Sequence, residues 1–376
     1  MTNLWLGGRS GTVVVARDYA AGLAERGWRV AIYAPNDVEG AADLAPGVEA
    51  LNSLGDAIDR PDLIHGHQHP ALFAAMARFP EASAVQLIHD SVGWHDQALR
   101  LERVRRYAAV DLACRDRVAH DTDLEAGDVT VLPNALDLRR CLPRRALPKR
   151  ARRVLVVANR VGTHVATVER ACTAAGLEVD SIGWGVGKGS DQLEAAMAEA
   201  DIVVGAARIA LEAMAVGCAA LVCDYRGLAG MAHPDTFDDW RANNFGLRLL
   251  QQAVTLEAVG EALTSYNAAA AAEVSARVRA ECGLDPALDR LEAFYRAALD
   301  DHAAALPVDR DREARAFGAY MQAWLPTNLA TSPFVAEATF HANAARTAQA
   351  RLAAVIQELG RRGIKIEFNG PPLKGG

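Results

Sequence analysis

The sequence predicts an α/β protein with two Rossmann-like parallel-sheet domains that face a cleft, followed by a helical C-terminal extension. Two observations predict this fold. Short apolar runs alternate with helix-like patterns up to about residue 285, as in parallel α/β sheets, and this alternation occurs in two similar halves. Beyond residue 285 the pattern is helical only, and 376 residues are enough for two domains and an extension.

Both halves contain apolar runs of strand length between amphipathic stretches of helix length. In the first half, strands are predicted near residues 3–6, 29–33, 62–64, 84–88, 110–112 and 129–132. Helices of that half are predicted at residues 13–26, 70–77 and 97–107. In the second half, strands are predicted near residues 154–158, 178–182, 202–204 and 220–223.

The domain boundaries follow from the places where this pattern breaks. Residues 143–153 contain two prolines and several basic residues, which favours a solvated linker, although a basic run can also contact anionic lipids. The predicted domains are residues 1–142 and 154–285, with the helical extension at residues 286–376. Helices of the extension are predicted at residues 287–299, 309–324 and 334–361. Their apolar spacing suits packing on the body of the protein or self-association.

Composition argues against several classes of protein. The net charge of −7 argues against nucleic-acid binding, because proteins that bind nucleic acids usually present a basic surface. The six cysteines are scattered without Cys-x-x-Cys spacing, as in reduced cytosolic proteins. No signal peptide opens the chain, and no apolar window approaches about 18 residues. We therefore expect a cytoplasmic protein that contacts the inner membrane at most peripherally.

The most informative segment surrounds Glu212. An apolar run at residues 202–204 is followed by Gly205 and then by a helix that carries Glu212 on its second turn. This order places the carboxylate beside the carboxyl end of a strand, where open α/β sheets bind ligands. A carboxylate can accept hydrogen bonds from both hydroxyls of a cis-diol, so a nucleotide ribose suits this position. The alternative is an amphipathic helix whose glutamate faces solvent.

Four motifs together resemble the GT-B glycosyltransferases, especially the retaining family 4. The C-terminal motif is Glu212-Ala-Met-Ala-Val-Gly217, which matches the family's Glu-Ala-Met-Ala-x-Gly. The other three motifs lie in the first half and follow the family's order: Pro61-Asp-Leu-Ile-His-Gly-His67, Val85-Gln-Leu-Ile-His-Asp90 and Val129-Thr-Val-Leu-Pro-Asn-Ala-Leu-Asp137. Their order and spacing are more specific than any one of them.

The resemblance implies a bacterial glycosyltransferase of polysaccharide biosynthesis that needs no metal or other cofactor. Its donor would be a UDP- or GDP-linked sugar, its acceptor a carbohydrate or a lipid-linked glycan, and configuration would be retained. Glu212 would then bind the ribose. His89, with Asp90 beside it, would be the catalytic pair, and the imidazole of His89 would hydrogen-bond the transferred sugar rather than act as a nucleophile. For His89 the alternative is a core histidine paired with backbone.

The sequence departs from the family at two donor-binding positions. The family's other glutamate, eight positions before Glu212, is replaced by Val204, which leaves the sugar specificity open. Arg160 stands where the family has a phosphate-binding arginine, but Val165 replaces its lysine. Because a diphosphate needs more than one cation, we expect Arg208 to replace that lysine, with help from helix N-terminal amides.

Three further residues complete the predicted donor site. Lys188 lies in a glycine-rich loop and is a second candidate for the missing cation, or an ordinary surface lysine. Gly8 precedes the first helix, where backbone amides can approach a phosphate closely, although a plain turn explains it nearly as well. Gly205 ends the strand before the Glu212 helix.

Three other functions remain open at this point. The alternating His65, His67 and His69 can ligate zinc, as in hydrolases of the amidohydrolase kind, but the required eight barrel units are not found. A degenerate GT-B module would bind a partner through its helical tail and have no affinity for nucleotides. A GT-B sugar-nucleotide epimerase would bind the same donor and release a free sugar epimer without using an acceptor.

Overall fold

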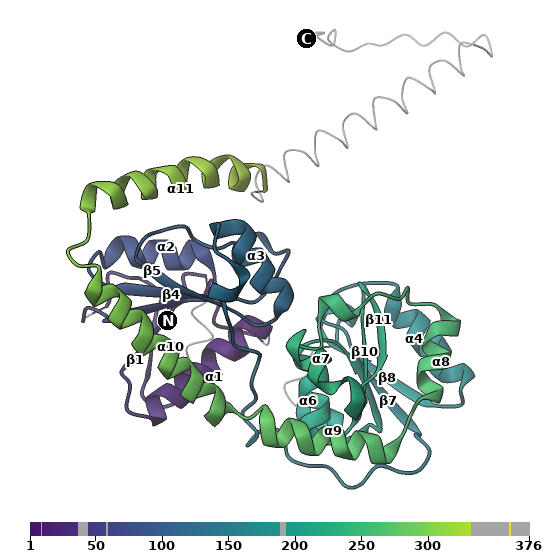
Figure 1. Ribbon diagram of the computed structural model, residues 1–376. Helices are drawn as coiled ribbons and strands as arrows, with labels where there is room; N and C mark the ends of the chain where they lie inside the picture. The colour runs from purple at the N-terminus through teal and green to yellow at the C-terminus, as the bar shows by residue number, and fades with distance from the viewer. Residues whose placement is uncertain (9, 37–43, 58, 189–192, 332–360, 362–376) are drawn as a thin grey trace. The chain divides into compact units, whose positions relative to one another are not determined.

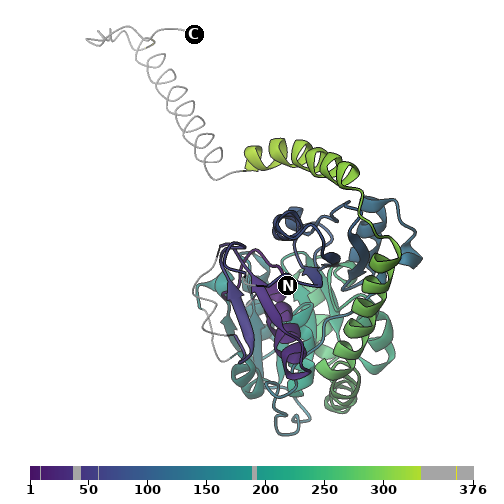
Figure 2. The same cartoon turned by 90° about the vertical axis from the view of Figure 1, so that its left-hand side faces the viewer.

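The computed structural model describes residues 1–8, 10–36, 44–57, 59–188, 193–331 and 361. The chain divides into two compact units, Met1–Val308 and Asp309–Gly376. The first unit contains both predicted α/β halves, with helices around the strands of each half (Figure 1, Figure 2). The predicted fold class of two Rossmann-like domains is thereby confirmed.

The sheet of the first half is parallel throughout its described strands. Its hydrogen-bonded order is β3 (Leu63–Gly66), β4 (Ser83–Ile88), β5 (Val104–Ala109) and β6 (Thr130–Val131). Strands β1 (Val30–Tyr33) and β2 (Val48–Leu51) form a second parallel pair. Thr2 bridges both Tyr33 and Gly66 in parallel, so it joins the pair to β3. The short strand predicted near residues 3–6 is reduced to this bridge.

Helices cover the sheet of the first half. They are α1 (Gly11–Glu25), α2 (His69–Arg78), α3 (Leu112–Thr122) and α10 (Leu284–Ala304). Helix α10 follows the second half in sequence but packs against α1, β4 and β5. The approach to α1 is close, because a Cβ on Gly22 would lie 2.4 Å from Leu288 Cδ1. Helix α10 therefore belongs to the first compact unit, and the second unit begins at Asp309.

The sheet of the second half has apolar side chains on both faces. Its strand order is β11 (Gly227–Met231), β10 (Ala219–Asp224), β9 (Ile202–Gly205), β7 (Arg153–Val157) and β8 (Glu178–Ile182), with β11 antiparallel to β10. The helices are α4 (His164–Ala174), α5 (Leu193–Glu199), α6 (Arg208–Val216), α7 (Phe237–Ala242), α8 (Leu256–Thr264) and α9 (Ala268–Glu281).

Strand β7 shows how these faces are filled. Leu155 and Val157 belong to the core shared with α5, α6 and α9. Val154 and Val156 belong to the core shared with α4 and α8. This alternation follows from the two-residue period of a strand that is buried on both faces. Each buried side chain of this size contributes about 1.5–3 kcal/mol.

The helix predicted at residues 97–107 and the strand predicted at residues 110–112 are wrong. β5 takes up the last part of the predicted helix, and the predicted strand falls on the bend between β5 and α3 and on the first residue of α3. The arginines in β5 are the reason. Arg106 pairs with Asp301 at 2.6 Å and Arg105 donates to His302 Nδ1 at 3.3 Å, so charged side chains in a strand are satisfied by α10.

The second unit contains α11 (Arg310–Thr331), which extends the helix predicted at residues 309–324. The helix predicted at residues 334–361 lies outside the described residues except for Arg361. In the part of the chain that the structure describes, no helix combines the length and the apolar character needed to cross a membrane.

Candidate functional site

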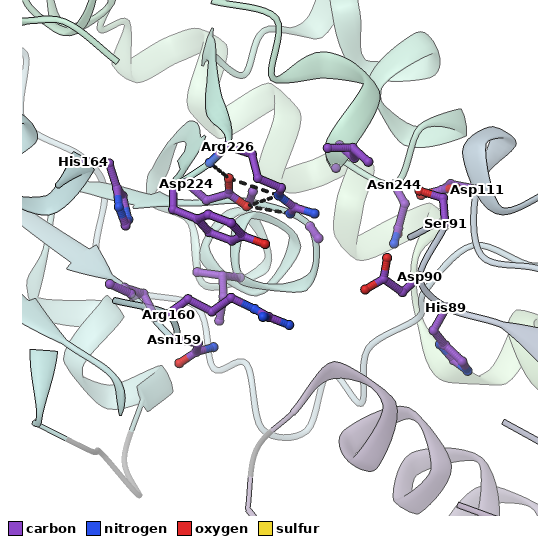
Figure 3. A pocket seen from close by; sticks show the side chains of 18 of the residues that line it. His89, Asp90, Ser91, Asp111, Asn159, Arg160, His164, Asp224, Arg226 and Asn244 are labelled. Atoms are coloured by element: carbon purple, nitrogen blue, oxygen red, sulfur yellow. Dashed lines mark hydrogen bonds and ion pairs between the residues drawn. The ribbon is translucent and has the colours of Figure 1, made fainter. Parts of the chain in front are cut away.

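A cavity of about 270 Å³ collects side chains from the carboxyl ends of strands in both halves (Figure 3). Strand β4 is followed by His89 and Asp90, and β7 is followed by Arg160. Strand β10 is followed by Tyr225 and Arg226. Open α/β sheets bind ligands at this edge, because the strand ends leave polar groups and helix N-termini facing a crevice.

Arg160 lines this cavity and has no ion-pair partner among the described residues. Its guanidinium carbon lies 5.8 Å from the centre of the Tyr225 ring. Arg226 also borders Tyr225, but Asp224 pairs with it at 2.6 Å. Asp90 lies on the opposite side of the cavity, on the segment that follows β4 (Figure 3). A ligand here meets an available cation on one side and a carboxylate on the other.

A second cavity of about 450 Å³ adjoins the first. It reaches from Gly8 and Gly11, at the start of α1, to Trp184, Arg208 and Glu212 in the second half. The two cavities share lining residues at the end of β7 and just after it, after β9 and in the first turn of α6: Val157, Asn159, Ala206, Ala207 and Ile209. Together they form one cleft lined from both halves, as predicted.

Glu212 borders the second cavity and belongs to a buried ionic cluster. Arg208 donates through Nε to Glu212 at 2.9 Å, through Nη2 to Asp18 at 2.8 Å and through Nη1 to the carbonyl of Ala135 at 3.0 Å. Arg140 pairs with the same Asp18 carboxylate at 2.7 Å. Glu212 is therefore not the solvent-facing glutamate of the alternative interpretation.

The start of α6 brings its amides to the point where the cavities meet. Ala207 adopts φ of +52°, an unusual value for a residue with a side chain, and its amide donates to the Phe245 carbonyl at 2.7 Å. No side chain caps this helix end. Gly205 is required one turn earlier, because a Cβ there would lie 2.3 Å from Ile209 Cγ2. The positive end of the helix is thus left facing the cleft.

A cluster of neutral histidines lies on the first-half side of the cleft. His67 Nδ1 and His89 Nε2 are hydrogen-bonded at 2.8 Å, His65 stacks on His67 with ring centres 4.3 Å apart, and His65 bonds to the Tyr295 hydroxyl. Burial lowers the pKa of His65 and His67 well below 6.5 and that of His89 to about 3. His89 lines the smaller cavity, but its Nε2 is already hydrogen-bonded to His67.

Asp96 lies behind His89 and is fully buried. Burial raises the pKa of this carboxyl to about 8, so it holds a proton at neutral pH. One of its oxygens accepts a hydrogen bond from the His89 amide at 3.3 Å. A neutral carboxyl group thereby supports the segment that carries His89 without adding a charge beside the cleft.

The positions of His65, His67 and His69 do not match the zinc site of the alternative interpretation. His69 begins α2 rather than continuing the strand of His65 and His67, and its Nε2 bonds to the Trp94 carbonyl at 3.0 Å. Within the described residues, no group of three or more His, Cys, Asp or Glu side chains is arranged to hold a metal ion. Two open sheets in place of a barrel contradict the amidohydrolase alternative.

Comparison with known proteins agrees with this geometry. The family model "Glycosyltransferase Family 4" matches residues 9–140, which include Asp18, His67, His89 and Asp90. A glycosyltransferase from Rickettsia africae ESF-5 has a similar structure, with a TM-score of 0.53 and 10% sequence identity over 77% of this chain and 96% of that one. The chain therefore has the GT-B fold, and residues 9–140 carry the similarity to the family 4 glycosyltransferases.

Other solved structures resemble this chain more weakly. WaaG, a glycosyltransferase involved in lipopolysaccharide biosynthesis, has a TM-score of 0.45 and 14% identity over 77% of this chain and 97% of its own. The lipopolysaccharide outer core galactosyltransferase WaaB has a TM-score of 0.38 and 10% identity over 74% and 99%. No curated protein matches the sequence.

The other predicted donor-site residues lie in different settings. Gly8 borders the larger cavity with φ of +74°, and a Cβ there would meet no atom within 4 Å. Lys188 is exposed, pairs with Asp180 at 2.8 Å and lines neither cavity. Arg208 lines the larger cavity, but each of its three nitrogens already donates within the protein.

The sequence analysis did not single out Tyr225 and Arg226, which line the smaller cavity, or Asp18, which contacts Arg208 at the wall of the larger one. Tyr225 and Arg226 directly follow a predicted strand, so their position at a strand end was a usable signal. Asp18 lies inside a helix, and no local pattern distinguishes it from a surface acid. It is recognised only from its contact with Arg208, 190 residues away.

Proposed function

We propose that this protein is a glycosyltransferase that moves a sugar from a UDP- or GDP-linked donor to a carbohydrate or lipid-linked acceptor, with retention of configuration and without a metal ion. The observation that carries the proposal is the continuous cleft in which Arg160, Glu212 and Asp90 come together from both halves. A donor of this kind has a ribose, a diphosphate and a sugar in a row, and the cleft offers a suitable group for each part.

The ribose of the donor would lie in the larger cavity against Glu212. This carboxylate is buried and fixed by Arg208, so it can accept hydroxyl hydrogen bonds without first being ordered. A hydrogen bond to a charged acceptor contributes about 1.5–3 kcal/mol. The proposal follows from the position of Glu212 at the wall of the cavity.

The diphosphate would lie where the two cavities meet. Arg160 is directed to this region without a competing carboxylate among the described residues, and the uncapped start of α6 adds amide donors. Both groups would stabilise the charge that develops on the departing diphosphate when the bond to the sugar breaks. A guanidinium and a helix end can do this without a metal ion.

The transferred sugar would lie in the smaller cavity, next to His89 and Asp90. Because burial keeps His89 neutral, it can exchange hydrogen bonds with sugar hydroxyls but does not supply a permanent positive charge. The acceptor would enter from the same side. We propose that the reaction takes place in the cytoplasm or at the inner membrane surface.

A thermal-shift panel of UDP- and GDP-linked sugars tests this proposal. We expect at least one donor to raise the melting temperature, because a ligand that binds only the native state stabilises it. The shift should persist in EDTA. No shift with any donor favours the degenerate binding module. Release of an epimerised free sugar without an acceptor identifies an epimerase, and a shift or turnover that needs added zinc contradicts metal independence.

A further inference from the structure

A buried ion triad connects the two halves of the cleft. It consists of Asp18 on α1, Arg208 at the start of α6 and Glu212 one turn further along α6. Their side chains are 5%, 7% and 4% exposed, respectively. Charges that are this deeply buried persist only when they are paired and hydrogen-bonded. The triad is therefore an organised feature and not a chance surface contact.

Helix α6 alone does not explain the presence of Arg208. A cation in the first turn of a helix opposes the helix dipole. The pair with Glu212 also has its arginine on the N-terminal side, which is the weaker order for an i, i+4 pair. The compensating contacts come from the first half, where Asp18 and the Ala135 carbonyl each accept a hydrogen bond from this guanidinium.

Arg208 is held in one orientation by these contacts. Nε, Nη1 and Nη2 each donate to a different acceptor, so turning the guanidinium toward a diphosphate would break buried hydrogen bonds. Its position instead fixes one oxygen of the Glu212 carboxylate. The opposite end of the same guanidinium is fixed by Asp18. The orientation of Glu212 thus depends on a carboxylate that belongs to the other half.

We propose that Asp18 is a positioning residue for nucleotide binding, which acts on Glu212 through Arg208. This inference rests on the proposed function, in which Glu212 receives the ribose. Asp18 holds the guanidinium, the guanidinium holds the Glu212 carboxylate, and the carboxylate meets the nucleotide. Because the triad spans both halves, nucleotide binding and the placement of α1 against α6 are linked, and each strengthens the other.

The test compares Asp18→Asn with Glu25→Gln by calorimetric titration of UDP and GDP. Both substitutions remove one negative charge from α1, and both affect an ion pair with an arginine, but the Glu25 pair with Arg139 is exposed. For whichever nucleotide the native protein binds, we expect Asp18→Asn to weaken affinity roughly tenfold or more, and Glu25→Gln to change it less than about twofold.

A double variant separates positioning from a general structural effect. If Asp18 acts through Glu212, Asp18→Asn should add little to the loss already caused by Glu212→Gln. Additive losses in the double variant would overturn the proposal. If Asp18→Asn does not fold, Asp18→Glu, which keeps the charge but moves it by one methylene group, should still weaken binding, and unchanged affinity in this variant would also overturn it.

The outcomes also distinguish this inference from the proposed function. A native protein that binds neither UDP nor GDP overturns the proposed nucleotide donor, and the role of Asp18 with it. A native protein that binds one of them, together with an Asp18→Asn variant that binds it equally well, overturns only the role of Asp18.

Discussion

Two buried polar clusters border the cleft and remain stable in opposite ways. The triad of Asp18, Arg208 and Glu212 keeps its charges, because each carboxylate faces a guanidinium. The cluster of His65, His67 and His89 is neutral, because burial lowers the pKa of all three rings. The stability of the charged cluster therefore depends on each of its partners, whereas the stability of the neutral cluster depends on pH.

The largest effect is expected for Arg208→Leu. This substitution removes the guanidinium shared by two buried carboxylates, of which Asp18 keeps its pair with Arg140. The free energy of unfolding should fall by about 3–5 kcal/mol. Urea denaturation followed by circular dichroism measures it. Arg139→Leu is the control, because Arg139 pairs at the surface and should contribute less than about 1 kcal/mol. Equal effects in the two variants would show that the triad is not an important buried charge cluster.

Glu212→Gln should have the next largest effect, on binding rather than on the fold. An amide oxygen replaces a charged acceptor, so affinity for the bound nucleoside diphosphate should fall by about 1.5–3 kcal/mol. Titration calorimetry gives this value. The same affinity in the variant and the native protein would mean that Glu212 serves the triad alone and does not contact the ribose.

Arg160→Ala and Arg208→Ala should differ in how strongly the loss of affinity depends on the phosphates of the ligand. Losing Arg160 should weaken nucleoside diphosphate binding by about 1 kcal/mol, with less effect on the free nucleoside and a smaller difference at high salt. Losing Arg208 should weaken both ligands equally if it positions Glu212. A larger loss for the diphosphate with Arg208→Ala would restore the sequence-based prediction that Arg208 grips the phosphate.

The neutral histidine cluster should make stability depend on pH. The native pKa of His67 is lowered, so below about pH 6.5 the unfolded chain binds a proton that the native ring does not. The free energy of unfolding from this group is therefore fully present above pH 6.5 and is lost as the pH falls. In His67→Gln, the free energy of unfolding should depend less steeply on pH between pH 6.5 and 5, by the equivalent of one proton. Parallel curves would place a charged His67 in the native state.

The smallest effect is expected for Lys188→Ala. Lys188 is exposed and paired with Asp180, outside both cavities. Its removal should change the free energy of unfolding and nucleotide affinity by less than about 0.5 kcal/mol each. A clear loss of diphosphate affinity would instead support the sequence-based prediction that its loop reaches the donor.

Much of the fold was predictable, because apolar runs in buried parallel strands depend on local sequence. Strand β8 lies at the predicted residues, and β7 and β9 lie within one residue of them. The prediction failed at β5, because Arg105 and Arg106 give this segment the polar pattern of an exposed helix face. Their partners lie on α10, almost 200 residues later, so the local sequence does not contain the contacts that stabilise these charges in a strand.

The candidate site was likewise predictable only in part. Glu212, Arg160 and His89 were predicted because each follows a strand in a recognisable motif, and all three line the cleft. The contacts that set their chemistry were not predictable. Asp18 reaches Arg208 only after both halves fold, and the bond from His67 to His89 depends on two neighbouring strands.

Turnover of a nucleotide sugar is the most direct test of the central claim that this cleft transfers a sugar from a nucleotide donor. The measurement is release of UDP or GDP from the donor that gives the largest thermal shift, followed by mass spectrometry with a glycan or lipid-linked acceptor present. We expect nucleoside diphosphate and glycosylated acceptor to form together, and Glu212→Gln to raise the KM for the donor. Binding without release of nucleoside diphosphate in the presence of acceptors would contradict the claim.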